Sequence, residues 1–166
     1  MGLILDSSIL IAGERRGETV AQILRRVRAS QGEIESALSV VTIVELTHGI
    51  YRAKNDKDRE RRQAFCDELR RDMVVYPVTV EIAELAGRIE GEQAAAGISI
   101  AFEDLLIGTT ALHLGYALAT LKCPSLSSIP WLEGGSTSLR IFFGKDGQPE
   151  GCAIRFLLSP RSSFFP

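Results

Sequence analysis

Leu3-Ile4-Leu5-Asp6-Ser7-Ser8 is a short apolar run that ends in an acid and two serines. Such a run, bounded by residues that cap helices, is typical of a strand that is buried on both faces and leads into a helix. Residues 37–41 form a second apolar run, and the helix predicted after it begins at Thr42-Ile43-Val44-Glu45 and continues toward Ala53. Strand and helix therefore alternate from the start of the chain.

The same alternation continues to about residue 120. Helical spacing of apolar residues, or alternating charge beside an apolar stripe, predicts helices over residues 18–28, 56–71, 79–96 and 103–114. Short apolar runs predict strands at residues 73–78 and 116–120. Strands that alternate with helices imply right-handed crossovers, so we expect an α/β protein with three layers, α/β/α, around a central, mainly parallel sheet.

Size and composition narrow the classes of function. The chain has 166 residues, 45% of them apolar and 24% charged, with a mean hydropathy of +0.10. A chain of this size buries about two-thirds of its surface on folding, so it needs no metal or disulfide to fold. The net charge of -2 excludes binding to nucleic acid by net charge alone, although a small group such as Arg15 and Arg16 remains a candidate for RNA phosphates.

The cysteines and apolar runs indicate a compartment. Three cysteines without a C-x-x-C spacing predict neither a disulfide framework nor a thiolate zinc site. The apolar runs are far shorter than the roughly 20 residues that span a bilayer, and Asp6 interrupts the first run too early for a signal peptide. We therefore expect a cytoplasmic protein without a membrane segment.

The composition changes after residue 132. Residues 134–138 have the composition of a linker, and Asp146-Gly147 favours a turn between apolar runs at 139–143 and 153–158. We expect a main domain over residues 1–132 and a C-terminal extension over 133–166, with a small hairpin and a frayed end. The extension is interpreted as a surface hairpin or as an arm that packs on a partner subunit.

Three acids stand where a parallel sheet places ligands. Asp6 follows the first predicted strand, Glu45 lies in the first predicted turn of the next helix, and Asp104 lies in the first turn of a later one. Clustered carboxylates repel unless a divalent cation such as Mg²⁺ or Mn²⁺ neutralises them. Such a cation lowers the pKa of bound water and stabilises the charge that develops on a phosphodiester. Each acid also fits a structural role, because Thr42 and Glu45 have capping-box spacing and the other two suit helix N-termini.

The ordered set of segments resembles the PIN-domain ribonucleases. The similarity rests on Leu3 to Ser8, on Ser39 to Leu46 with Gly49, and on Asp104 to Leu112, and it covers about residues 1–132. Within that superfamily the chain is most similar to the VapC-type toxins of toxin-antitoxin pairs. The resemblance implies a Rossmann-like fold, a Mg²⁺- or Mn²⁺-dependent endoribonuclease, an RNA substrate, a homodimer and a small antitoxin whose tail covers the site.

The resemblance also assigns site residues. It implies that Asp6, Glu45 and Asp104 are the catalytic, metal-binding acids. Hydroxyl residues of the family match three further positions, which would orient acids, water or phosphate: Ser7, Thr42 and Thr120.

One segment departs from the family pattern. Lys122 stands where the family usually has Asn, and Ser125 stands where it usually has an acid. The loss of a carboxylate weakens a second metal site, because Mg²⁺ depends on charged oxygen ligands. Lys122 is therefore a candidate either for contacting a phosphate or for repelling metal.

Two other functions stay open. The departure favours, as an alternative, a PIN-like protein that has lost cleavage and acts by binding RNA or an antitoxin. A small-molecule phosphatase that uses the same acids is the third hypothesis, but no phosphate-binding glycine loop accompanies them.

Overall fold

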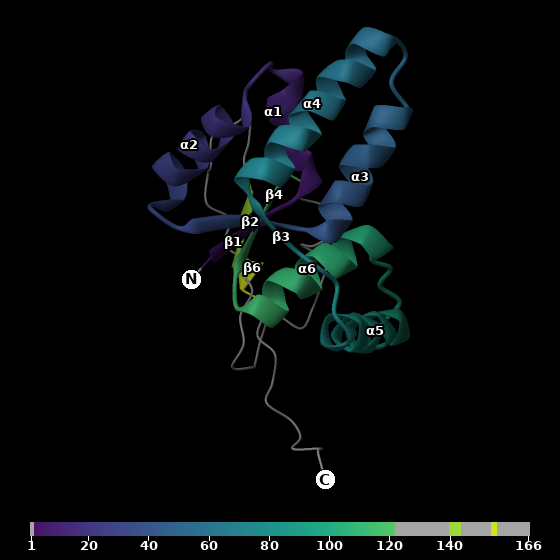
Figure 1. The fold of residues 1–166 in the computed structure, drawn as a ribbon. Coiled ribbons are helices and arrows are strands. Elements are labelled where there is room, and N and C mark those ends of the chain that lie inside the picture. Colours follow the sequence, from purple (N-terminus) through teal and green to yellow (C-terminus); the bar gives the residue numbers. More distant parts are fainter. Residues whose placement is uncertain (1, 122–139, 144–153, 156–166) are drawn as a thin grey trace.

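The fold is a twisted sheet with helices on both faces, as the computed structural model shows for residues 2–121, 140–143 and 154–155 (Figure 1). The strand order is β3-β2-β1-β4-β5-β6, in which neighbouring strands are parallel except that β6 runs antiparallel to β5. The strands are β1 (Gly2–Leu5), β2 (Glu35–Ser39), β3 (Val74–Tyr76), β4 (Ala117–Thr120), β5 (Arg140–Phe143) and β6 (Ile154–Arg155). The predicted three-layer α/β/α fold with a mainly parallel sheet is confirmed.

The helices form two layers because β1 directs alternate side chains to opposite faces. The helices are α1 (Ser7–Arg15), α2 (Val20–Gln31), α3 (Val40–Tyr51), α4 (Asp56–Asp72), α5 (Val80–Ala95) and α6 (Phe102–Leu114). Leu3 and Leu5 pack in one core cluster with residues of α1, α2 and α4, whereas Ile4 packs in the other with residues of α5 and α6. The central strand is therefore buried on both faces, as its sequence predicts.

The boundary between β2 and α3 differs from the prediction. Ser39 ends β2 and caps α3, since its hydroxyl accepts a hydrogen bond from the Val41 N–H at 3.3 Å. The helix begins at Val40, two residues before the predicted start, so Glu45 lies in its second turn and not in its first. Thr42 is not the N-cap residue; its hydroxyl donates to the Leu5 carbonyl at 3.5 Å. The capping-box interpretation of Thr42 and Glu45 is therefore wrong.

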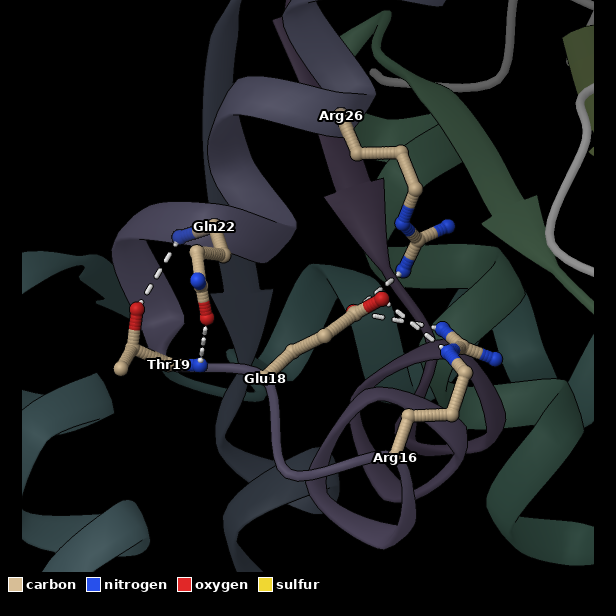
Figure 2. A network of polar contacts seen from close by, with 5 residues as sticks. All are labelled: Arg16, Glu18, Thr19, Gln22 and Arg26. Atoms are coloured by element: carbon tan, nitrogen blue, oxygen red, sulfur yellow. Dashed lines mark hydrogen bonds and ion pairs between the residues drawn. The ribbon is translucent and has the colours of Figure 1, made fainter.

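The turn between α1 and α2 is held by polar contacts (Figure 2). Thr19 and Gln22 form a capping box at the start of α2, with bonds of 2.8 and 3.2 Å between side chain and backbone. Glu18 lies between Arg16 and Arg26, at 3.0 and 3.1 Å. The hydrogen bond from Arg16 is the main cause that lowers the pKa of Glu18. Arg16 is therefore engaged in an ion pair, although the sequence made it a candidate for binding phosphate.

The other helices follow their predictions closely. Helix α4 is solvent-facing and buries Phe65, Cys66 and Leu69, as its apolar stripe indicates. Gly115 ends α6 with a φ of 64°, a left-handed conformation that suits glycine. None of the helices in the described ranges is both long and apolar enough to span a bilayer.

The C-terminal part is described only at two strands. Strand β5 continues the sheet in parallel beyond β4, with Thr120 opposite Phe143. The predicted linker at 134–138, the predicted turn at 146–147 and the predicted frayed end lie outside the described residues. The division into 1–132 and 133–166 stays a prediction.

Candidate active site

Asp6 is at the carboxyl end of β1, between the ends of β2 and β4. Its backbone N–H donates to the Ala119 carbonyl at 2.9 Å, which continues the β1–β4 pairing by one residue. It occupies the N-cap position of α1, but its side chain makes no capping hydrogen bond, so the capping interpretation does not explain this carboxylate. The residue is only 2% exposed.

Two hydroxyl groups bind the same oxygen of this buried carboxylate. Ser8 Oγ donates to Asp6 Oδ2 at 2.6 Å, and Thr120 Oγ1 donates to the same atom at 2.7 Å. Hydrogen bonds to an ionised acceptor are shorter and stronger than neutral ones, and they offset part of the cost of burying a charge. Thr120, which the sequence assigned to the site, is therefore in contact with Asp6.

Ser8 is a site residue that the sequence analysis did not select. Among the described residues, the α1 hydroxyl that is bonded to Asp6 belongs to Ser8 and not to Ser7. Ser7 is 2% exposed at the start of α1, and its assignment to the site stays a prediction. The signal that could have selected Ser8 is local, since the second of two serines after a strand-ending acid lies within one helical turn of that acid.

Thr42 brings α3 against the end of β1. It is fully buried, and its hydrogen bond to the Leu5 carbonyl reaches the residue directly before Asp6. Ser39 Oγ, at the start of the same helix, lies 3.3 Å from Thr110 Oγ1 of α6. The beginning of α3 is thus fixed both to β1 and to α6, and Glu45 projects from the next turn as a half-buried residue.

Asp104 lies in the first turn of α6 and is also half-buried. The next residue, Leu105, belongs to the same core cluster as Ile4 of β1 and Val41 of α3. The first turn of α6 is therefore held in the same core as the first turn of α3 and the central strand. Asp6 therefore follows β1 directly, and Glu45 and Asp104 lie on two helices that each contact that strand.

The donor chemistry of these acids fits a hard divalent cation, because Mg²⁺ and Mn²⁺ prefer carboxylate oxygens. Asp6 has a second feature that suits such a site, because the hydroxyls of Ser8 and Thr120 hydrogen-bond to its buried carboxylate and hold it in a defined position. Among the described residues, no three His, Cys, Asp or Glu side chains stand close enough together to form a ready metal-binding group. Lys122 and Ser125 lie outside the described residues.

A cavity of about 100 Å³ opens beside Glu45, between α1, α3 and α4. Its walls are partly apolar, with Leu46, Phe65 and Cys66, and burial raises the pKa of the Cys66 thiol. Arg15, the other arginine that the sequence nominated for phosphate binding, lines the cavity together with Glu45. The Arg15 guanidinium and the predicted site acid Glu45 therefore line the same cavity.

Helix α4 forms one wall of this cavity, and two of its arginines hydrogen-bond to the other two helices. Arg61 Nε donates to Glu14 Oε1 at 2.7 Å, which ties α4 to α1. The Arg62 guanidinium donates to the Gly49 carbonyl at 2.5 Å, which ties α4 to α3. Hydrogen bonds thus connect α4 to each of the other two helices that line the cavity.

The fold agrees with a comparison to known families. The model of the PIN domain matches residues 3–121, and the chain belongs to the PIN-domain family. Within this family it is similar to the VapC ribonucleases. It is 30% identical over 133 residues to ribonuclease VapC1 of Rickettsia felis, an alignment that covers 80% of this chain and 94% of that protein.

A second curated relative is also a VapC ribonuclease. The ribonuclease VapC of Rickettsia bellii is 29% identical over 133 residues, again with 80% of this chain and 94% of the relative covered. These relatives support the assignment of the chain as a toxin-type endoribonuclease of the PIN class, and hence as a hydrolase.

Solved structures of VapBC complexes share the fold. VapBC2 of Rickettsia felis, bound to a DNA fragment from its promoter, matches with a TM-score of 0.67 and 19% identity, covering 78% of this chain and 94% of that one. VapBC-5 of Mycobacterium tuberculosis, from the VapBC family of toxin-antitoxin systems, matches with a TM-score of 0.65 and 23% identity, covering 87% of this chain and all of that one.

Proposed function

We propose that the chain is a divalent-metal-dependent endoribonuclease, the toxin of a toxin-antitoxin pair, which hydrolyses RNA phosphodiesters. The observation that carries the proposal is the buried Asp6 carboxylate at the end of β1, with hydroxyls of Ser8 and Thr120 on one of its oxygens. A buried acid held in this way, in a PIN domain related to VapC ribonucleases, has the chemistry of a metal ligand.

Asp6, Glu45 and Asp104 would hold Mg²⁺ or Mn²⁺, which when bound supplies an activated water and stabilises charge on the phosphate. The protein orients these acids. Thr120 holds the Asp6 carboxylate, and Thr42 holds the first turn of α3, from which Glu45 projects one turn later. Hydrolysis of this kind leaves a 5'-phosphate and a 3'-hydroxyl.

Arg15 is proposed to hold a phosphate of the RNA beside the site. It lines the same cavity as Glu45, whereas its neighbour Arg16 is paired with Glu18. A guanidinium matches the geometry of a phosphate, and each such contact makes binding more sensitive to salt.

The test compares RNA cleavage by wild type and Asp6→Asn in Mg²⁺ or Mn²⁺, with Asp56→Asn as the control. Asp56 has a side chain that is 89% exposed, and it stands at the start of α4. We expect Asp6→Asn to abolish cleavage and Asp56→Asn to retain it, with 5'-phosphate ends on the products. Full activity of Asp6→Asn would remove the site assignment.

A second titration decides between cleavage and binding alone. Mn²⁺ is titrated into wild type and into Asp104→Asn by calorimetry, after any antitoxin has been removed. Loss of binding in the variant supports the metal site. A wild type that binds RNA or an antitoxin, but binds no Mn²⁺ at millimolar concentration, would favour the PIN-like protein without cleavage that the departure at Lys122 suggests.

We further propose that the partners are a small antitoxin and a second copy of this chain, and that the protein acts in the cytoplasm. For the second copy the structure offers an apolar stripe on α3, where Val40, Val44 and Tyr51 are 37%, 61% and 77% exposed. These positions recur along one side of the helix, which favours packing against another apolar face. Light scattering of wild type and Val44→Glu tests this, and a wild-type monomer would refute the homodimer.

A further inference from the structure

We propose that Ser8 is a positioning residue that locks the Asp6 carboxylate and ties it to the chain that follows β4. The inference rests on the proposed function of Asp6 as a metal-binding acid. Three contacts of one hydroxyl group carry it: Ser8 Oγ lies 2.6 Å from Asp6 Oδ2, 3.0 Å from the Leu121 backbone nitrogen and 3.4 Å from Thr120 Oγ1.

The proton count decides how these contacts work. A serine hydroxyl has one proton to donate and two lone pairs that accept. Ser8 donates its proton to Asp6 Oδ2, and its oxygen accepts the Leu121 N–H. Thr120 gives its own proton to the same Oδ2 at 2.7 Å. Both protons are therefore spent on the carboxylate, and the 3.4 Å separation of the two hydroxyl oxygens is a contact and not a further hydrogen bond.

Two donors on one oxygen restrict the carboxylate. They reach Asp6 Oδ2 from two different elements, since Ser8 belongs to the first turn of α1 and Thr120 ends β4. Rotation of the Asp6 side chain would break both charge-assisted bonds at once, so the plane of the carboxylate is fixed. A carboxylate that binds a metal needs a fixed orientation, and the residues that hydrogen-bond to it supply that orientation.

The contact with Leu121 extends the effect beyond Asp6. The Leu121 N–H is the first backbone donor after β4, and Ser8 draws it onto the first turn of α1. The backbone of Leu121 is thus held at a defined position relative to the acid. One side chain couples the position of the site acid to the end of the neighbouring strand.

The test compares Ser8→Ala with Ser8→Thr, and uses Ser30→Ala as the matched control. Ser30 is an exposed serine on α2 whose hydroxyl donates to the Val27 carbonyl at 2.8 Å, away from the predicted acids. Mn²⁺ affinity is measured by calorimetry, and RNA cleavage is measured in parallel. We expect Ser8→Ala to weaken Mn²⁺ binding by about 10- to 100-fold, which is typical when an outer partner of a metal ligand is removed.

Ser8→Thr keeps the hydroxyl, so it should restore most of the affinity, and Ser30→Ala should bind Mn²⁺ as wild type does. A merely structural role would not predict this rescue. Wild-type Mn²⁺ affinity in Ser8→Ala, or a loss in Ser8→Thr as large as that in Ser8→Ala, would overturn the proposal.

Two readouts do not depend on metal. Hydrogen exchange of the Leu121 amide should become faster in Ser8→Ala but not in Ser30→Ala. The losses in urea midpoint for Ser8→Ala and Asp6→Asn should not add in the double variant. If wild type binds no Mn²⁺, the proposed function fails, and these readouts alone decide for Ser8: unchanged exchange or additive losses overturn its role.

Discussion

Gly13→Ala is the substitution whose effect the structure defines best. Gly13 lies near the end of α1, where it faces the fully buried Ile23 of α2. An added Cβ would stand 2.4 Å from Ile23 Cδ1, 2.7 Å from Ile23 Cγ1 and 3.0 Å from Glu18 Oε2. The two distances to Ile23 are too short for carbon atoms, so Ile23 or the helix itself must move.

The magnitude follows from two opposed effects. Replacing glycine by alanine inside a helix ordinarily stabilises by about 0.8–1.0 kcal/mol, because alanine has less backbone freedom to lose. Overpacking a buried site costs about 1–3 kcal/mol, since the neighbours leave their preferred rotamers. We therefore expect Gly13→Ala to lower the free energy of unfolding by about 1 kcal/mol.

Urea unfolding monitored by circular dichroism measures this, with Gly91→Ala as the control. Gly91 lies within α5, and an added Cβ there would meet no atom within 4 Å, so the control should gain up to about 1 kcal/mol. Ile23→Val removes the nearest clashing atom, and the double variant with Gly13→Ala should lose less than the sum of the two single losses. A stabilising Gly13→Ala, equal to Gly91→Ala, would refute the reasoning.

Three further predictions concern stability. The hydrogen bond from Arg16 lowers the pKa of Glu18 in the folded protein, so the ionised carboxylate stabilises the fold above the unfolded pKa of 4.5, and this stabilisation is lost as the pH falls below 4.5. Glu18→Gln should therefore lower the free energy of unfolding by up to about 1 kcal/mol at pH 7 and by much less at pH 3. Urea midpoints of wild type and variant at pH 7 and pH 3 measure this difference. Tyr116→Phe removes a hydroxyl that donates to Glu35 at 2.9 Å, and a loss of about 1 kcal/mol is expected in the same assay, whereas an unchanged midpoint would contradict it. Leu10→Ala creates a cavity at a fully buried position and should cost about 2–5 kcal/mol in thermal or urea unfolding; a loss below 1 kcal/mol would mean that the core collapses around it.

The order of the elements and the place of Asp6 at the carboxyl edge of the sheet follow from the sequence alone. The run Leu3 to Leu5 predicts a strand buried on both faces, and the structure places it at the centre of the sheet between β2 and β4. Asp6 follows that strand directly, so its place at the carboxyl edge needs no knowledge of other segments. The placement of Asp104 in a first helical turn is equally local, and the structure confirms it.

Two nearby hydroxyl residues compete for the N-cap of α3, which explains why the start of this helix was predicted at the wrong residue. Ser39 and Thr42 both have hydroxyls that suit a helix N-cap, and local spacing favoured Thr42 because Glu45 follows it by three residues. In the fold the hydroxyl of Thr42 points to the Leu5 carbonyl, while Ser39 caps α3. Packing of α3 against β1 decided between two positions that are nearly equivalent in the sequence.

The sequence by itself determined the alternation of strands and helices, the buried central strand and the acid at its end, because each depends on residues within a few positions of one another. Only the tertiary structure decided that Ser8 and Thr120, which are 112 residues apart, bind the same carboxylate oxygen. That meeting depends on the pairing of β1 with β4, which sets Leu5 opposite Ala119 and so brings the next residue of each strand together. No local pattern contains that register, because it is fixed by the packing of the whole sheet.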